Sequence, residues 1–135
     1  MALDQWARIA NANKTKLRKV AEVAIINMVD RVIILSPVAT GLFKNNWMVG
    51  MNSPDHSTTR FVAKTATGVR GGAVLRRAMA KIRSMKIGDT IHFSNSLPYA
   101  WRLEYGYSRK APAGMVRVTV ANWQQEVDKA ARMVR

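Results

Sequence analysis

The 135-residue sequence has no cysteine, only 8 acidic residues and only 4 prolines. Without cysteine there is no disulfide framework, no thiolate metal site and no cysteine nucleophile, which fits a reducing compartment. No apolar run approaches the roughly 18 to 20 residues of a membrane span, and the N-terminal residues carry Asp4 and lack the apolar core of a secretory signal. We therefore expect a soluble chain that makes no membrane contact.

Motifs for catalysis are missing as well. The sequence contains no His-Glu-x-x-His pair, no phosphate-binding loop and no dinucleotide fingerprint. His56 and His92 have no partner at metal-ligand spacing, so we expect them to serve surface or packing roles. Asp89 and Glu104 could meet in space, but acids in so basic a chain are more often charge partners than an acid/base pair. The expectation is no enzymatic activity, no metal and no cofactor.

Positive charge is abundant, since 22 Lys and Arg residues give a formal net charge of +14. Between Asp55 and Asp89 the sequence has eight basic residues and no acid: Arg60, Lys64, Arg70, Arg76, Arg77, Lys81, Arg83 and Lys86. A solvated helix face normally mixes the two signs, so this run favours a surface that meets nucleic acid or an acidic protein. The solvated face is the alternative. The candidate contacts are Arg70, Arg76, Arg77, Lys81, Arg83 and Lys86.

A long helix is predicted from about Leu3 to Leu35, because apolar residues recur there at steps of three and four. Its second half is apolar on more than one side, so we expect another subunit to cover part of it, with Val29 and Ile33 in the contact. Asn11 and Asn13 weaken helix propensity enough to make a break plausible.

The remaining pattern predicts a single α+β domain over residues 1–135, with a long N-terminal helix, a small mainly antiparallel sheet, a central basic helix and a C-terminal helix. The expected segments are strands at 47–51 and 59–65 paired as a hairpin, a helix at 73–85, a strand at 90–94 and a helix at 115–134.

Residues 95–114 form a dense loop that holds all three tyrosines. Pro98 suits the first position of a short helix, and Gly106 stands where that helix needs positive φ to end. Glu104 is predicted to hold the loop through a salt bridge to Arg102 or Arg109.

The aromatic residues of this loop allow two interpretations. Stacking of nucleic-acid bases is one, but their crowding between Pro98 and Gly114 favours packing or a protein interface. The candidate interface residues here are Tyr99, Leu103, Tyr105, Tyr107, Arg109 and Lys110.

Two segments resemble one known family. Residues 36–47 read Ser-Pro-Val-Ala-Thr-Gly-Leu-Phe-Lys-Asn-Asn-Trp, and residues 93–116 contain Asn-Ser-Leu-Pro-Tyr-Ala, Leu-Glu-Tyr-Gly and Ala-Pro-Ala-Gly-Met. In order and spacing these are similar to the small phage head-to-tail joining proteins, which include neck, tail-completion and minor tail protein Z-like proteins. The matching positions are Ser36, Pro37, Thr40, Gly41, Trp47, Asn95, Pro98, Tyr99, Glu104, Gly106, Pro112 and Gly114. The departures are Ala39, where the family commonly has Asp, and Arg109-Lys110, where a glutamine is usual.

The resemblance, over roughly residues 20–134, implies a non-enzymatic virion protein of the neck or tail, assembled in the host cytoplasm. It would form a ring, a hexamer in preference to a dodecamer, that completes the tail and joins it to the head connector or stopper, with genomic DNA passing through its lumen. Its tail-side partner would be a terminator or tube protein. The alternatives are a tail terminator that caps the tube, a basic DNA-binding protein and, least favoured, a small hydrolase or nuclease.

Overall fold

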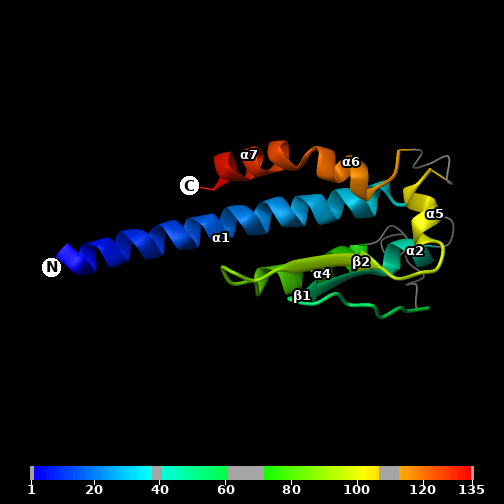
Figure 1. Ribbon diagram of the computed structural model, residues 1–135, viewed down its shortest axis with the longest axis horizontal. Coiled ribbons are helices and arrows are strands. Elements are labelled where there is room, and N and C mark those ends of the chain that lie inside the picture. The colour runs from blue at the N-terminus through cyan, green and yellow to red at the C-terminus, as the bar shows by residue number, and fades with distance from the viewer. Residues whose placement is uncertain (1, 38–40, 61–71, 107–112, 135) are drawn as a thin grey trace.

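The computed structural model describes residues 2–37, 41–60, 72–106 and 113–134, and all structural statements below concern these residues. Its elements, in chain order, are α1 (Ala2–Leu35), α2 (Leu42–Asn45), β1 (Trp47–Met51), α4 (Gly72–Arg83), β2 (Ile91–Asn95), α5 (Ala100–Glu104), α6 (Val116–Ala121) and α7 (Trp123–Met133). Helix α1 runs through the middle, with α6 and α7 along one side and the two strands with α4 along the other (Figure 1). The predicted α+β class is confirmed.

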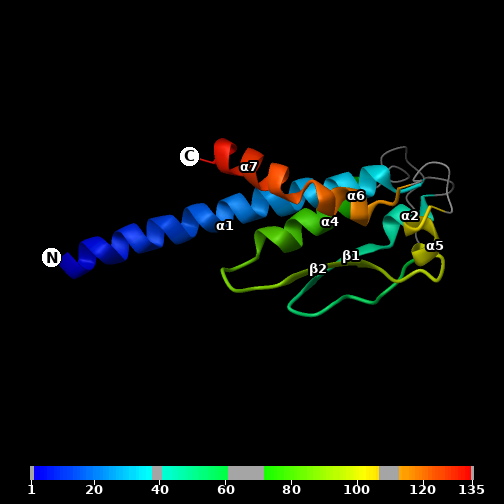
Figure 2. The same cartoon turned by 45° about the horizontal axis from the view of Figure 1, so that its top comes forward.

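Helix α1 is continuous over 34 residues, so the break considered at Asn11 and Asn13 does not occur. The side chains of residues 4–17 are exposed, and this part of the helix projects beyond the other elements in both views (Figures 1 and 2). At the other end, the Ser36 hydroxyl donates to the Val32 carbonyl at 2.7 Å and closes the last turn ahead of Pro37. No helix in the described ranges is long and apolar enough to cross a membrane.

The two strands pair antiparallel, with Trp47 opposite Asn95 and Met51 opposite Ile91. The predicted hairpin between 47–51 and 59–65 is therefore wrong in its described part, because residues 59 and 60 are not in a strand; residues 61–65 lie outside the described residues.

The side chain of Asn46 holds the segment that follows β1, residues 52–60, in place of hydrogen bonds between strands. This buried side chain accepts from the Thr59 N–H at 2.8 Å and donates to the Thr59 carbonyl at 2.9 Å. The same segment lies directly over Gly50, where any Cβ would clash with the Ser53 carbonyl oxygen. Side-chain hydrogen bonds and close packing replace the expected pairing.

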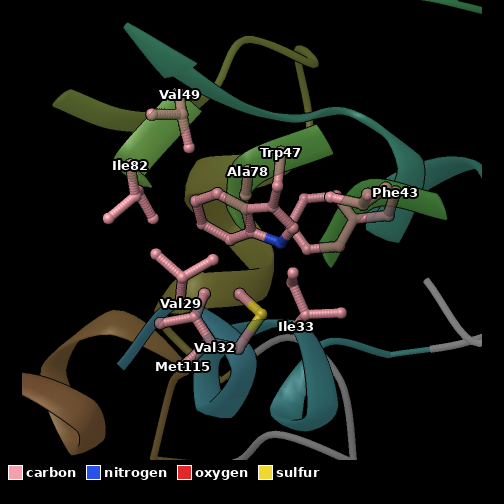
Figure 3. Packing of buried hydrophobic residues seen from close by; sticks show 10 residues of the cluster. Val29, Val32, Ile33, Phe43, Trp47, Val49, Ala78, Ile82 and Met115 are labelled. Atoms are coloured by element: carbon pink, nitrogen blue, oxygen red, sulfur yellow. The ribbon is translucent and has the colours of Figure 1, made fainter. Parts of the chain in front are cut away.

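Trp47 lies at the centre of the core (Figure 3). Its indole stacks on Phe93 with ring centroids 4.7 Å apart, meets the edge of Phe43 at 5.7 Å and donates from Nε1 to the Ser36 hydroxyl at 2.9 Å. Val29 and Ile33 belong to the same cluster and are only 3% and 2% exposed. The chain itself covers Ile33, so the prediction that Ile33 contacts another subunit is wrong, whereas Val29 also lines an open groove and its contact with another subunit stays a prediction.

The C-terminal helix is interrupted once. Asn122 separates α6 from α7 with φ −103° and ψ 11°, and its side-chain amide donates to the Val118 carbonyl at 2.9 Å. An asparagine that bonds back to the preceding turn competes with helix continuation, a local effect that apolar periodicity does not register. Helix α7 then runs back along α1, and Ala130 is fully buried (Figure 1).

Candidate assembly interface

The two segments that carry the family resemblance meet at the end of the molecule where α1 stops. The Asn95 side-chain amide donates to the Phe43 carbonyl at 2.9 Å, and the Asn95 oxygen accepts from the Leu97 N–H at 3.2 Å. Tyr99 lies against Phe43 with ring centroids 6.0 Å apart. Gly41 has φ 82°, the left-handed conformation from which α2 begins. The remaining predicted residues Thr40, Arg70, Tyr107, Arg109, Lys110 and Pro112 lie outside the described residues.

Glu104 binds the start of α6, and we call Glu104 with residues 114–117 the Glu104 clamp. One carboxylate oxygen accepts from the N–H groups of Met115 at 2.9 Å and Val116 at 3.0 Å, and the other from the N–H of Arg117 at 2.9 Å. The Arg117 side chain adds an ion pair to the carboxylate at 3.3 Å and a bond to the Glu104 carbonyl at 2.6 Å. The predicted role for Glu104 holds, but the ion-pair partner that the geometry establishes is Arg117.

The chemistry of the Glu104 clamp favours the ionised carboxylate. Partial burial raises the pKa of Glu104, but the backbone N–H bonds from Arg117, Met115 and Val116 outweigh it and hold the pKa below its ordinary value of 4.5. Gly114 makes the approach possible, since it has φ 88° and a Cβ there would lie 2.6 Å from the Glu104 carbonyl oxygen and from Oε1. A glutamate and a glycine ten positions apart therefore act as one structural unit.

Replacing Glu104 with glutamine should lower the free energy of unfolding at pH 7 by about 2 kcal/mol, because an amide NH₂ is brought against N–H donors. A carboxyl with a depressed folded-state pKa stabilises the fold above its unfolded pKa, and that stability is lost as pH falls through the folded value. Wild type should therefore lose stability as pH falls below 4.5, and E104Q should lose less. Urea unfolding at several pH values measures both.

The exposed Asp128→Asn serves as the matched control for E104Q. It removes one carboxylate in the same way, and we expect it to keep the wild-type acid dependence. An E104Q variant with the acid dependence of wild type would contradict the role given to the clamp.

Next to the clamp, Trp101, Tyr105 and Arg117 form an aromatic patch. Trp101 and Tyr105 are 71% and 54% exposed, with ring centroids 4.5 Å apart, and the Arg117 guanidinium lies 4.4 Å from the Tyr105 ring centroid. Such a patch of aromatics in contact with an arginine has the composition of protein interface hot spots. Tyr105 was predicted for an interface. Trp101 belonged to the aromatic set for which packing or an interface was predicted, but it was not among the candidate contacts, although its i, i+4 spacing to Tyr105 placed both on one face of a short helix.

Of the other interface candidates in this loop, one side chain is exposed and one packs against the core. Tyr99 is 40% exposed and stays a surface candidate. Leu103 is half-buried and packs against the core cluster, so it contributes to the fold of the subunit more than to an open surface.

An apolar groove of about 460 Å³ opens between α1, β2, α6 and the start of α7. Its floor is the middle of α1, including Met28 and Val32; one wall is β2, and the other is α6 with the start of α7. Val120 and Trp123 on that second wall are 58% and 42% exposed. The sequence indicated that the segment forming α6 and α7 has a periodic apolar face. It did not indicate that α1 covers only part of that face.

Only some of the basic residues predicted to contact nucleic acid or an acidic protein are exposed and without a structural role in the fold. Arg76, Lys81 and Lys86 are exposed, and we keep the name basic surface for these three. Arg77 instead donates to the carbonyls of Asn45 and Trp47, both at 3.2 Å, and so helps to hold α4 against β1.

Arg83 also has a partner inside the subunit. It lies 3.7 Å from the carboxylate of Glu22, which is 3% exposed and also pairs with Arg18 at 2.8 Å. The fold therefore brings an acid from α1 next to a basic run that contains none in the sequence. Arg77 and Arg83 act at least partly as structural residues.

Comparison of the chain with known protein families, with curated proteins and with solved structures finds no match. In the described part of the chain, no three His, Asp or Glu side chains are grouped so that they could hold a metal ion. The surfaces described above are therefore the basis on which a function is inferred.

Proposed function

We propose that this chain is a non-enzymatic structural protein of the phage neck. Copies of it form a ring, six in preference to twelve, that completes the tail and joins it to the head-side connector, with DNA passing through the lumen. The partners would be a connector or stopper protein on the head side and a terminator or tube protein on the tail side. The resemblance of residues 36–47 and 93–116 to the head-to-tail joining proteins supports this assignment.

One structural observation carries the proposal: three of the four tryptophans are on the surface. Trp6, Trp101 and Trp123 are 69%, 71% and 42% exposed, whereas only Trp47 is buried. Tryptophan is enriched at the centres of protein interfaces, and each of these three stands with an exposed apolar neighbour: Ile9, Tyr105 and Val120 respectively. Their places in the exposed first turns of α1, the aromatic patch and the groove wall give each subunit several distinct surfaces, as a ring that also binds neighbours above and below requires.

Residues of the two segments that resemble the head-to-tail joining proteins also support the proposal, because they connect neighbouring elements rigidly. The Glu104 clamp fixes α5 to α6, and the bonds of Asn95 fix β2 to α2. A virion joint has to transmit force between head and tail without changing shape, and a rigid connection between elements is suited to that task. The aromatic patch is carried on this rigid part.

Imaging of the purified protein tests the proposal. We expect negative-stain images to show closed rings with a central channel, and native mass spectrometry to give a mass of six subunits. In intact particles, an antibody against the chain should label the junction between head and tail. A protein that stays monomeric at micromolar concentration, or that labels neither head nor tail, would rule the proposal out. Label at the tail tube end of free tails would favour the tail terminator.

The basic surface gives a separate prediction. The triple variant Arg76→Glu, Lys81→Glu, Lys86→Glu should still form rings but should bind duplex DNA more weakly, with the slope of log K against log salt reduced by about 2 to 3. Titration at several salt concentrations measures that slope.

The control for this variant reverses Arg60, Lys129 and Arg132, which are exposed outside the basic surface and change the net charge by the same amount. If binding depended on net charge alone, both triple variants would lose affinity equally, and the basic surface would have no special role. Tight, salt-sensitive DNA binding by a wild-type protein that forms no ring would favour the DNA-binding alternative instead.

A further inference from the structure

The first four turns of α1 carry an exposed apolar stripe. Trp6, Ala10 and Leu17 follow one another at i, i+4 and i+11 and so share one face, with Ile9 beside them and the polar Asn13 between Ala10 and Leu17. Trp6, Ile9 and Leu17 are 69%, 45% and 60% exposed. We call residues 4–17 the N-terminal arm; Figures 1 and 2 show it extending past the end of α7. An arm of this kind has the anchor spacing of a helix that binds in a groove.

The apolar groove described above offers an apolar lining for the anchors of such a helix. It lies along α1, with α6 on one side of that helix and β2 on the other (Figure 1). The groove is open, because Val120 and Trp123 on its wall remain substantially exposed. Asp89 also lines it, and the Lys86 backbone N–H and the Asn52 side chain that donate to its carboxylate lower its pKa and keep it ionised.

The arm cannot reach the groove of its own subunit. Trp6 and the floor residue Met28 are 22 positions apart on one unbroken helix, which separates them by about 33 Å at 1.5 Å per residue. Bringing them together would require breaking α1. The arm that fills a groove must therefore come from another copy of the chain.

We propose that the N-terminal arm of one subunit lies in the apolar groove of the next subunit, with Trp6 and Ile9 as its anchors. The contact is charge-matched, since Lys14 and Lys16 flank the stripe on its two sides and Asp89 lines the groove. It is heterologous, because arm and groove are different surfaces, and repeated head-to-tail contacts of this kind close into a ring. The inference rests on the self-assembly proposed above and specifies which surfaces make it.

Cysteine cross-linking tests the pairing directly, because the natural sequence has no cysteine. Two single variants, I9C and V120C, are mixed and oxidised. We expect a disulfide-linked heterodimer of I9C with V120C, and a chain carrying both changes should give a ladder of multimers. The control pairs I9C with I34C, whose position is 65% exposed on α1 and outside the groove, and should give no such product.

Substitution of the anchors tests the energetics. W6D with I9D on the arm, or V120D on the groove wall, should weaken self-association about 100-fold or more, whereas the control I34D should leave it unchanged. All four positions are exposed, so circular dichroism and thermal melting should match wild type. A mixture of the arm variant and the groove variant retains one intact arm and one intact groove, and should stop at the dimer in analytical ultracentrifugation.

Three results would overturn the inference, and they have different meanings. If wild type forms rings and the arm and groove variants do so equally well, the arm proposal is wrong and the ring proposal stands. If I9C links only to I9C, the arms pair with each other and not with the groove. If wild type does not associate at all, both this inference and the proposed function fail.

Discussion

Replacing Trp47 with alanine should lower the free energy of unfolding by about 3 to 5 kcal/mol, the range for removing a large aromatic side chain from a core. Trp47 contacts Phe43 and Phe93, and its Nε1–H is the donor to Ser36. Its loss opens a cavity between α1, the sheet and α4. In urea, with an m-value of about 2 kcal/mol per molar, the unfolding midpoint should fall by about 2 M.

Trp101→Ala is the matched control, since the same side chain is removed from a position that is 71% exposed. It should cost about 1 kcal/mol or less, the loss of its contact with Tyr105. Equal destabilisation by the two substitutions would mean that Trp47 does not organise the core. If the aromatic patch contacts a neighbouring protein, Trp101→Ala should reduce assembly while leaving the fold stable, which is the reverse of the effect of Trp47→Ala.

Gly114→Ala should be the second most disruptive single change, at about 3 kcal/mol or more. The left-handed conformation costs a non-glycine residue about 1 to 2 kcal/mol. The remainder comes from the Cβ, which would sit 2.6 Å from two oxygens of Glu104 and push the carboxylate away from the N–H groups that it accepts from. Thermal and urea unfolding measure the total, and loss of the Glu104 acid dependence would report that the clamp has opened.

Gly88→Ala separates the two contributions. Gly88 also has positive φ, 97°, but a Cβ there would meet nothing within 4 Å. Its substitution should therefore cost only the backbone strain of about 1 to 2 kcal/mol. If Gly88→Ala and Gly114→Ala were equally destabilising, the close approach of Gly114 to Glu104 would carry no energetic weight.

Local signals predicted the helices and strands well. Periodic apolar residues gave α1 and α4 to within a few residues, and Pro37 and Gly106 marked the helix ends that they were expected to mark; Pro98 was expected at the first position of α5 but lies just before its N-cap, Tyr99. These signals act over one or two turns of chain, and a single sequence contains them in full. The interruption at Asn122 was missed because the apolar periodicity continues across it.

Pairing over long distances was predicted poorly. Strand β1 pairs with β2, some 40 residues later, although a nearer segment had the composition of a strand. The nearer segment is held instead by Asn46, and nothing in its sequence indicates which side chain will bind its backbone. The cover of Ile33 was misassigned for the same reason, since an apolar helix face does not reveal whether its own chain or another covers it.

The candidate site was predicted in part. The loop holding Glu104 and Gly114 was recognised as important, and its glutamate as the residue that holds it. The partner proved to be Arg117, which belongs to the helix that follows the loop. The groove and the arm were not predicted, because each is an apolar surface that the rest of the fold leaves uncovered. Which surfaces stay uncovered depends on where the other helices and strands end, and the sequence pattern does not give that.

The uneven placement of the tryptophans has a spectroscopic consequence. Trp47 is shielded and stacked on Phe93, so its emission reports the integrity of the core, while Trp6, Trp101 and Trp123 report contact with water at three separate places on the surface. Burial of an indole shifts its emission to shorter wavelength. Single-tryptophan versions of the chain, made by changing the other indoles to phenylalanine, would therefore show without any attached label which surface is covered first as subunits associate.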